Sequence, residues 1–334
     1  IPLGLGIALG FLLSSALAGD GANPSVFPLF LGVAMCVTAI PVIAKTLSDM
    51  GLLHRNVGQL TLAAGMIDDA VGWLLLSIVS AAATTGVATG NITLPILYMA
   101  LFILVAIFIG RPVVRWVMVR TTRSGASSGQ TVAAAVVVVL LGSVLTHVLG
   151  MEAIFGAFIA GILIATSGSR VQERLAPLRT VVLSVLAPLF LATAGLRMDL
   201  TELARPEVAV AAAAVLAVAI VGKFAGAYLG ARISKLTRWE GLALGAGMNC
   251  RGVVEVIVAL TGLRLGVLDV AGYTVIVLVA IVTSLITPPT LRFAMARIEL
   301  AEEERLRKID HDTWQRGGAP VAASDAQGER SEDE

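Results

Sequence analysis

Long apolar runs, separated by short polar segments, set the pattern of the sequence. A helix needs about 20 apolar residues to cross the hydrocarbon core of a bilayer, and residues 128–149 and 270–291 each reach that length. The same test along the chain predicts an all-α polytopic membrane protein. We expect its ten spans at 3–19, 28–47, 58–82, 92–110, 128–149, 152–167, 181–197, 207–230, 240–262 and 270–291.

The composition favours burial in lipid over burial in a water-soluble core. The chain is 57% hydrophobic and 14% charged, whereas a soluble domain carries about 25% charged residues. The net charge of +1 comes with no basic patch, so we expect no nucleic acid partner. Cys36 and Cys250 both lie in apolar runs, and we expect no disulfide framework.

Lysine and arginine fall mainly into alternate loops. By the positive-inside rule, the loops richer in these residues face the cytoplasm. The richer set contains Arg55, Arg111, Arg115, Arg120, Arg123, Arg170, Arg174, Arg179, Arg232, Lys235 and Arg238. The poorer set contains Arg197, Arg205 and Arg264. We therefore expect the richer set and the C-terminal tail on the cytoplasmic side.

The predicted topology contains an inverted repeat. The first three spans begin on the inside, and the last three begin on the outside, so the two triplets run in opposite directions. Transporters use this arrangement to build two alternating faces around one site. The last six spans form one unit, and a matching first unit needs three more helices before Ile1. We therefore expect an N-terminally truncated fold with about ten of thirteen spans.

Two adjacent carboxylates, Asp68 and Asp69, lie in the middle of the span 58–82. A carboxylate at bilayer depth costs roughly 2.5–3.5 kcal/mol on insertion scales. Burial and a like-charged neighbour both favour the neutral form, so the pair titrates as a coupled unit. Deprotonated, the pair offers oxygen ligands to a small metal cation; protonated, it holds none. This competition is the minimum chemistry of an antiporter, and a structural ion pair inside the bundle is the alternative.

Lys223 is a second charge at bilayer depth, about two helical turns from the cytoplasmic end of the span 207–230. Its side chain could extend to the interface or pair with Asp68 and neutralise both groups. On the second hypothesis, a cation that binds Asp69 breaks the pair, and Lys223 releases a proton.

Two spans carry signs of an interrupted helix. Pro41 removes a backbone donor inside 28–47, and the span 240–262 contains the run GAGMNCRG. Irregular backbone at this depth is tolerated where it lines a covered site, and matched interruptions in opposite triplets point to the binding site. The residues expected to line it are Thr38, Ala39, Pro41, Asn249, Arg251 and Glu255.

The roles of these lining residues stay open at this point. Arg251 and Glu255 are four residues apart and share a helical face, which fits either a mutual ion pair or a direct part in transport. Thr38 and Asn249 could give neutral oxygens to the cation or cap a broken helix end.

The residues around the two interruptions and the aspartate pair resemble those of a known family. The run FLGVAMCVTAIPVIAK (30–45), followed by DMGL (49–52) and the Asp68–Asp69 pair, resembles the monovalent cation/proton antiporter superfamily. The resemblance is to its second branch, which includes bacterial sodium or potassium/proton exchangers and plant and fungal cation/proton exchangers. The runs FGAFIAG (155–161) and MNCRGVVE (248–255) are similar to that branch too.

The resemblance implies a cation/proton exchanger transmembrane domain over residues 1–293. Within it we expect a core of helices in 1–82 and 207–291, with two crossing discontinuous helices. Dimerisation helices, which form a scaffold, are expected within 92–197. The charged cytoplasmic tail, 294–334, is expected to be largely disordered after a surface helix from Glu299 to Lys308.

Family roles carry over to three residues. The essential ion-binding carboxylate corresponds to Asp69, its partner carboxylate to Asp68 and the core-helix lysine to Lys223. Asp69 and Asp68 would then hold the transported Na⁺ or K⁺.

The sequence therefore predicts a secondary antiporter that exchanges Na⁺ or K⁺ for protons by alternating access, without enzymatic activity or a cofactor. We expect a homodimer in the bilayer of a bacterial plasma (inner) membrane. A cation channel or a non-transporting membrane sensor on the same fold is the alternative. An intramembrane aspartyl protease needs one aspartate on each of two facing helices, whereas adjacent residues on one helix diverge by about 100°.

Overall fold

The computed structural model describes residues 1–85, 93–123, 128–305 and 307. This part of the chain is helical apart from loops and one isolated bridge between Ala18 and Leu268. The first elements are α1 (Pro2–Leu17), α2 (Val26–Cys36), α3 (Ile40–Asp49), α4 (Asn56–Thr85), α5 (Thr93–Val105), the π-helical turn η1 (Ala106–Gly110), α6 (Arg111–Arg123) and α7 (Ser128–Val148). The next are α8 (Ala153–Ala165), α9 (Ser169–Arg174), α10 (Ala176–Val181), the π-helical turn η2 (Val182–Leu186), α11 (Ala187–Leu196) and the 3₁₀ turn η3 (Leu200–Ala204). The last are α12 (Pro206–Ile233), α13 (Arg238–Met248), α14 (Val253–Arg264) and α15 (Val270–Met295).

The predicted spans all fall on helices of the described chain. Seven helical segments are long and apolar enough to cross a membrane, and the pair α13–α14, bent by 45°, makes an eighth candidate. The remaining two predicted spans correspond to the shorter apolar helices α1 and α8, of 16 and 13 residues. The prediction of an all-α polytopic membrane protein is thus confirmed.

Two predicted span boundaries are wrong. The helix that begins at α5 does not end at residue 110 but runs through η1 into α6, so Arg111, Arg115 and Arg120 lie on a helix and not in a loop. Arginine is a good helix former, and the charged face of α6 extends the apolar span without a break. Likewise, the span predicted to begin at residue 181 begins at Ala176.

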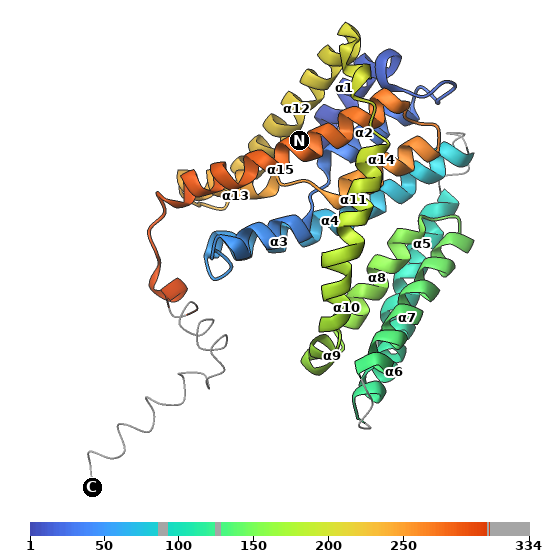
Figure 1. The fold of residues 1–334 in the computed structure, drawn as a ribbon, viewed down its shortest axis with the longest axis vertical. Helices are drawn as coiled ribbons and strands as arrows, with labels where there is room; N and C mark the ends of the chain where they lie inside the picture. Colours follow the sequence, from blue (N-terminus) through green and yellow to red (C-terminus); the bar gives the residue numbers. More distant parts are fainter. Residues whose placement is uncertain (86–92, 124–127, 306, 308–334) are drawn as a thin grey trace.

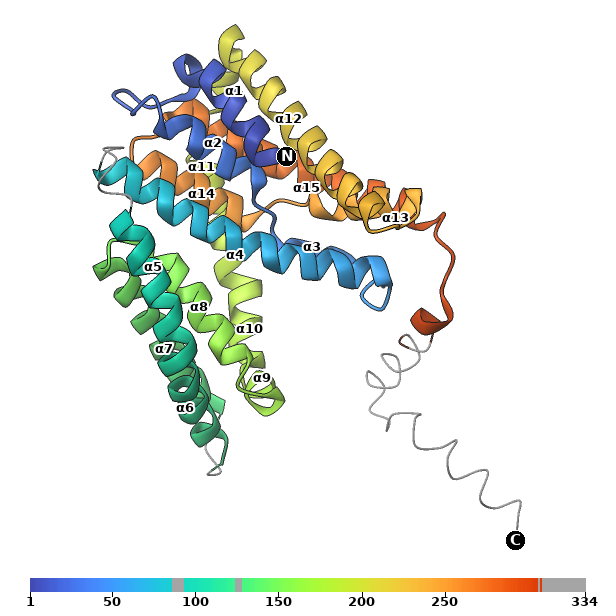
Figure 2. The same ribbon diagram turned by 180° about the vertical axis from the view of Figure 1, so that it is seen from behind.

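The helices form two groups (Figures 1 and 2). One contains α1–α4 and α12–α15, and the other contains α5–α9; α11 packs against α14 of the first group, and α10 extends from it to α9. Burial separates the two groups as well: in the most apolar 18-residue stretch of Val26–Asp49, 78% of the residues are buried, against 17% in that of Ser128–Val148. The first group therefore holds the packed interior. The expected division into a moving core and a dimer-forming scaffold stays a prediction.

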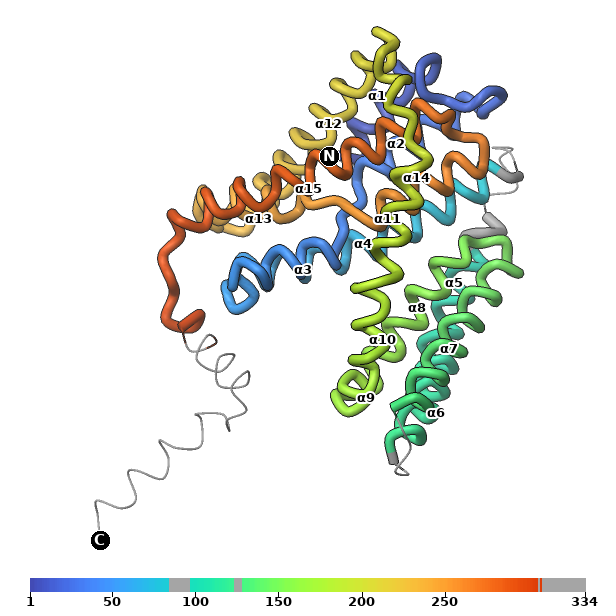
Figure 3. The backbone as a smooth tube through the Cα atoms, viewed as in Figure 1, coloured from blue at the N-terminus to red at the C-terminus, as the bar shows by residue number. Residues whose placement is uncertain are grey.

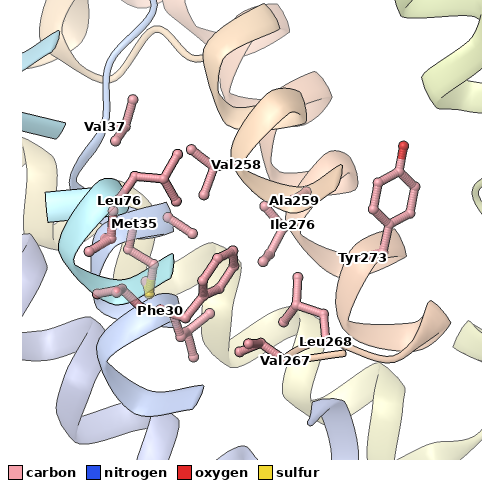
Figure 4. Packing of buried hydrophobic residues seen from close by; sticks show 14 of the residues in the cluster. Phe30, Met35, Val37, Leu76, Val258, Ala259, Val267, Leu268, Tyr273 and Ile276 are labelled. Atoms are coloured by element: carbon pink, nitrogen blue, oxygen red, sulfur yellow. The ribbon is translucent and has the colours of Figure 1, made fainter. Parts of the chain in front are cut away.

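The centre of the first group is closely packed around the first interrupted span. Phe30 and Met35 on α2, Leu76 on α4, Val258 on α14 and Ile276 on α15 meet there, each at most 2% exposed. Figure 4 shows these side chains pointing toward one another. Burying a side chain of this size stabilises a fold by about 1.5–3 kcal/mol in water; inside a bilayer, contact between neighbouring side chains has to supply much of that stability.

Candidate ion-binding site

The two interrupted spans cross at their breaks. Residues 37–39 are unwound between α2 and α3, and residues 249–252 are unwound between α13 and α14. The N–H of Ala39 donates a hydrogen bond of 3.2 Å to the carbonyl of Cys250, so one break pairs with the other. Figure 3 follows both breaks along the backbone.

Local sequence explains why the chain breaks at these points. Pro41 lies in the first turn of α3, where a backbone N–H has no helical partner anyway, so the proline starts a helix instead of kinking one. At the other break, a Cβ added to Gly252 would lie 2.6 Å from Cγ2 of Val42. A glycine at this position lets the two breaks approach closely.

Lys223 and Thr38 both contact Asp68. Nζ of Lys223 lies 2.6 Å from Oδ2 of Asp68, and the hydroxyl of Thr38 donates to the same oxygen. Nζ also donates to the carbonyl of Cys36, the last residue of α2. Lys223 is 4% exposed, so its side chain pairs inside the bundle and does not extend to the surface.

Asp69, the residue after Asp68, is buried, and one of its carboxylate oxygens accepts no hydrogen bond within the described part of the chain. The residue is 4% exposed, and the oxygen without a hydrogen-bond partner among the described residues is its Oδ1. Oδ1 of Asn249, on the second break, is likewise buried and without a partner in that part of the chain. Buried polar atoms in proteins are almost always hydrogen-bonded, so each of these two oxygens is a candidate ligand for a cation.

Arg251 joins the second break to the first. Its Nη1 lies 2.6 Å from Oε1 of Glu255 and 3.0 Å from the carbonyl oxygen of Ala34, and its Nη2 lies 2.6 Å from that of Met35. Those carbonyls belong to the last turn of α2, where a helix leaves acceptors free. Arg251 thus makes an ion pair with Glu255, one of the two alternatives that the sequence left open, and caps a helix of the other triplet as well.

One polar residue at the crossing escaped the sequence analysis. The hydroxyl of Ser284, on α15, donates to the carbonyl of Arg251. The two adjacent hydroxyl residues in the apolar run from 275 to 286, Thr283 and Ser284, were the available signal. In the described part of the chain, no three His, Cys, Asp or Glu side chains gather as ligands of a resident metal.

The structure therefore brings together Thr38, Asp68 and Lys223 in one cluster and Arg251 and Glu255 in another, with the backbone of Ala39 between the breaks. Their part in ion binding stays a prediction.

Comparisons with known proteins agree on a family. The family described as "Sodium/hydrogen exchanger, transmembrane" matches residues 2–297. The Na(+)/H(+) antiporter NhaS4 of Synechocystis sp. is 32% identical over 289 residues, which cover 86% of this chain and 70% of that protein.

Plant and yeast proteins are also similar. Cation/H(+) antiporter 17 of Arabidopsis thaliana is 30% identical over 291 residues, or 86% of this chain and 35% of that protein. K(+)/H(+) antiporter 1 of Saccharomyces cerevisiae is 29% identical over 297 residues, or 86% of this chain and 34% of that protein. The chain thus spans about a third of the length of these two relatives.

Proposed function

Because the chain belongs to the sodium/hydrogen exchanger family, we propose that it exchanges a monovalent cation, Na⁺ or K⁺, for protons across a membrane. One observation carries the proposal: Asp69 is buried with a free oxygen, next to an Asp68 that is held by Lys223. The pair therefore contains one carboxylate that has a counter-charge and one that lacks it. A free carboxylate at this depth must gain either a proton or a metal cation.

The exchange follows from competition at this pair. A cation that enters binds Asp69 and draws on neighbouring oxygens, among them those of Asp68, Thr38 and Asn249. Asp68 can turn toward the cation only by leaving Lys223, and the freed ammonium can then give up its proton. When protons return, one neutralises Asp69 and one restores the ammonium of Lys223, which pairs with Asp68 again, and the cation leaves.

Contacts between the two helix groups support alternating access. Trp73 on α4 stacks near Phe158 on α8, with ring centroids 6.3 Å apart, and the hydroxyl of Ser80 donates to Glu152 at 2.7 Å. Ser80 lies about 16 Å beyond Asp69 along the helix. These contacts close the end of α4 that follows the site.

The other end of α4 is more open. Met66 and Ile67, which precede the site, are 63% and 68% exposed, and the side chain of Asp68 is 24% exposed. The end that precedes the site starts next to Arg55, in the loop set expected on the cytoplasmic side. We propose that the site opens toward this side through the exposed part of Asp68.

The assembly and location are part of the proposal. Apolar side chains on the outer faces of α7 and α11 are exposed, including Leu141 at 63% and Leu189 at 58%, and lipid or a second copy of the chain would cover them. We infer a homodimer in a bacterial plasma (inner) membrane with a cytoplasmic C-terminus. Light scattering of the detergent-solubilised protein tests the dimer, and a monomer mass would refute it.

Reconstitution in proteoliposomes tests the function. With a pH-sensitive dye inside, each cation is added in turn, and we expect Na⁺ or K⁺ to drive proton movement while choline does not. Asp69→Asn should reduce the signal to that of protein-free vesicles, since it removes the charge and keeps the shape. The matched control is Asp49→Asn, whose side chain is 58% exposed and pairs with Lys45 on the surface. Normal exchange by Asp69→Asn would refute the site.

A further inference from the structure

The chain that follows α15 returns to the start of the helix that carries the aspartates. α15 ends at Met295, and residues 302–305 form one helical turn. Ile298 packs against the buried cluster that includes Leu47 and Val57. Figures 1 and 3 show this segment, in orange-red, leaving the end of α15 and passing the far end of α3.

Arg55, directly before α4, contacts this segment through hydrogen bonds and an ion pair. Its Nη2 donates to the carbonyls of Ile298 at 3.0 Å and Glu299 at 3.2 Å. Its Nε lies 3.1 Å from Oε2 of Glu304. The side chains of the ion pair are only 9% and 4% exposed, so this is a buried pair, unlike the mostly exposed pairs of the protein surface.

Glu304 in turn caps α4 from outside. The N–H of Asn56, the first residue of α4, donates to Oε1 of Glu304 at 2.6 Å, and the N–H of Ala301 donates to Oε2 at 3.0 Å. Arg55 precedes the helix and has no acceptor in its side chain. Glu304 therefore satisfies a free N–H at the start of α4, where a negative charge is also favoured by the helix dipole.

The neighbouring glutamates behave differently. The side chains of Glu302 and Glu303 are 79% and 85% exposed, and their closest cationic atoms, on Arg305 and Arg307, lie at 3.7 and 3.9 Å. Exposed pairs of this kind contribute little. Of the three consecutive glutamates, the buried one is the one that contacts α4, so the docking is specific to Glu304.

We propose that residues 298–304, bound to Arg55 and Asn56, form a tail clasp that restrains the start of α4 and slows cation/proton transport. The proposal rests on the proposed function, in which α4 carries Asp68 and Asp69 between two states. Any displacement of α4 against its neighbours must carry the clasp along or break it. Breaking it leaves the charges of Arg55 and Glu304 without their partners.

The clasp is not a proton sensor near neutral pH. Burial acts to raise the pKa of Glu304, but the N–H groups of Asn56 and Ala301 and the guanidinium of Arg55 lower it by more, so the pKa lies below its usual range. A depressed pKa means that the contact is complete above the unfolded value of about 4.3 and is lost only as the pH falls through the folded value.

Hydrogen exchange and transport together test the clasp. In Glu304→Gln, the amides at the start of α4 should exchange about fivefold faster, the effect of losing roughly one helix cap. Cation-dependent proton flux in proteoliposomes should rise by a similar factor, and equally at neutral and mildly acidic pH. The matched control is Glu303→Gln, which changes the same charge one residue away and should alter neither. A second pair of variants ends the chain after Arg297, which removes the clasp, or after Lys308, which keeps it.

The outcomes are distinct. If amide hydrogen exchange at the start of α4 were unchanged in both Glu304→Gln and the shorter truncation, residues 298–304 would not dock on α4. Faster amide hydrogen exchange together with unchanged or slower cation/proton transport would refute the claim that the clasp slows transport. Absence of cation-dependent flux in the unmodified protein would refute the proposed function instead, while the exchange measurement would still decide whether the tail binds.

Discussion

The two interrupted spans cross each other, yet their free carbonyl groups are satisfied by different kinds of donor. At the end of α2, the carbonyls of Ala34, Met35 and Cys36 receive hydrogen bonds from Arg251 and Lys223. Both donors are cations, both are buried, and both come from the second triplet. The partial negative charge at the end of this helix is therefore met by two full positive charges.

The second break is held by neutral groups. The carbonyl of Cys250 accepts from the N–H of Ala39, and the carbonyl of Arg251 accepts from the hydroxyl of Ser284. Oγ1 of Thr38 lies 3.4 Å from the carbonyl oxygen of Met248.

The difference teaches how an inverted repeat can have unequal chemistry. The carboxylates Asp68 and Asp69 belong to the first triplet, and Lys223, the cation that pairs with Asp68, belongs to the second. On the proposed function, a mobile cation that arrives at the crossing would compete with Lys223 near the first break. The second break contributes close backbone contact, and its carbonyls carry no fixed counter-charge.

The largest effect on stability is expected from Arg251→Met. The variant leaves Glu255 buried without its partner and two carbonyls of α2 without donors. Removing one partner of a buried ion pair costs about 3–5 kcal/mol. We expect a much lower Tm of the purified protein in detergent, followed by intrinsic fluorescence.

A double variant separates the two contributions of Arg251, the ion pair with Glu255 and the capping of α2. Arg251→Met combined with Glu255→Leu removes both charges, and such replacements recover much of the loss. If the double variant were as unstable as the single one, the capping of α2 and not the ion pair would be the main contribution of Arg251.

Lys223→Met should have a smaller effect on stability and a clear effect on transport. The side chain of Asp68 is 24% exposed, against 3% for that of Glu255, so the loss of the ammonium is less costly than at Arg251. Without that ammonium, Asp68 has lost the partner that a cation must displace, so the pH profile of cation-dependent flux should change. The control is Lys45→Met, whose side chain is 74% exposed. An unchanged pH profile would remove Lys223 from the exchange.

Gly252→Ala tests the contact between the two breaks. The added Cβ would lie 2.6 Å from Val42 and 3.3 Å from Cβ of Ala39, and overpacking of this kind costs about 1–3 kcal/mol. Combining the change with Val42→Ala should restore most of the Tm. Gly161→Ala, where a Cβ meets nothing within 4 Å, should leave the Tm unchanged or raise it. Equal effects at the two glycines would mean that the breaks do not depend on close approach.

Much of the fold followed from one-dimensional signals. Apolar run length predicted the spans, and Pro41 and the run GAGMNCRG marked the two breaks, since each acts on the backbone at its own position. For Lys223 the sequence left two alternatives, extension to the interface or pairing with Asp68, and the structure has the second.

Contacts between segments far apart in the chain could not be predicted from the sequence. A pair between Arg251 and Glu255 was one of two alternatives from the sequence, and it is present, but the bonds of Arg251 to α2 join residues 216 and 217 positions apart. The docking of Glu304 on Asn56 spans 248 positions, and no local pattern encodes it. Arg111–Arg123 continue a helix because arginine tolerates one, although the same arginines had marked a loop. Ser284 belongs to this class, since its partner is a carbonyl on another helix.

Ser284→Ala should give the smallest effect and the sharpest comparison. It removes a neutral donor from the carbonyl of Arg251, and losing such a bond costs about 1 kcal/mol. The control is Thr290→Ala on the same helix, whose hydroxyl bonds within α15, 3.0 Å from the carbonyl of Thr287. We expect a small drop in Tm for Ser284→Ala, well below that of Arg251→Met. A drop as large as that of Arg251→Met would mean that the second break depends on its donors as strongly as the first, and the contrast between charged and neutral support would be wrong.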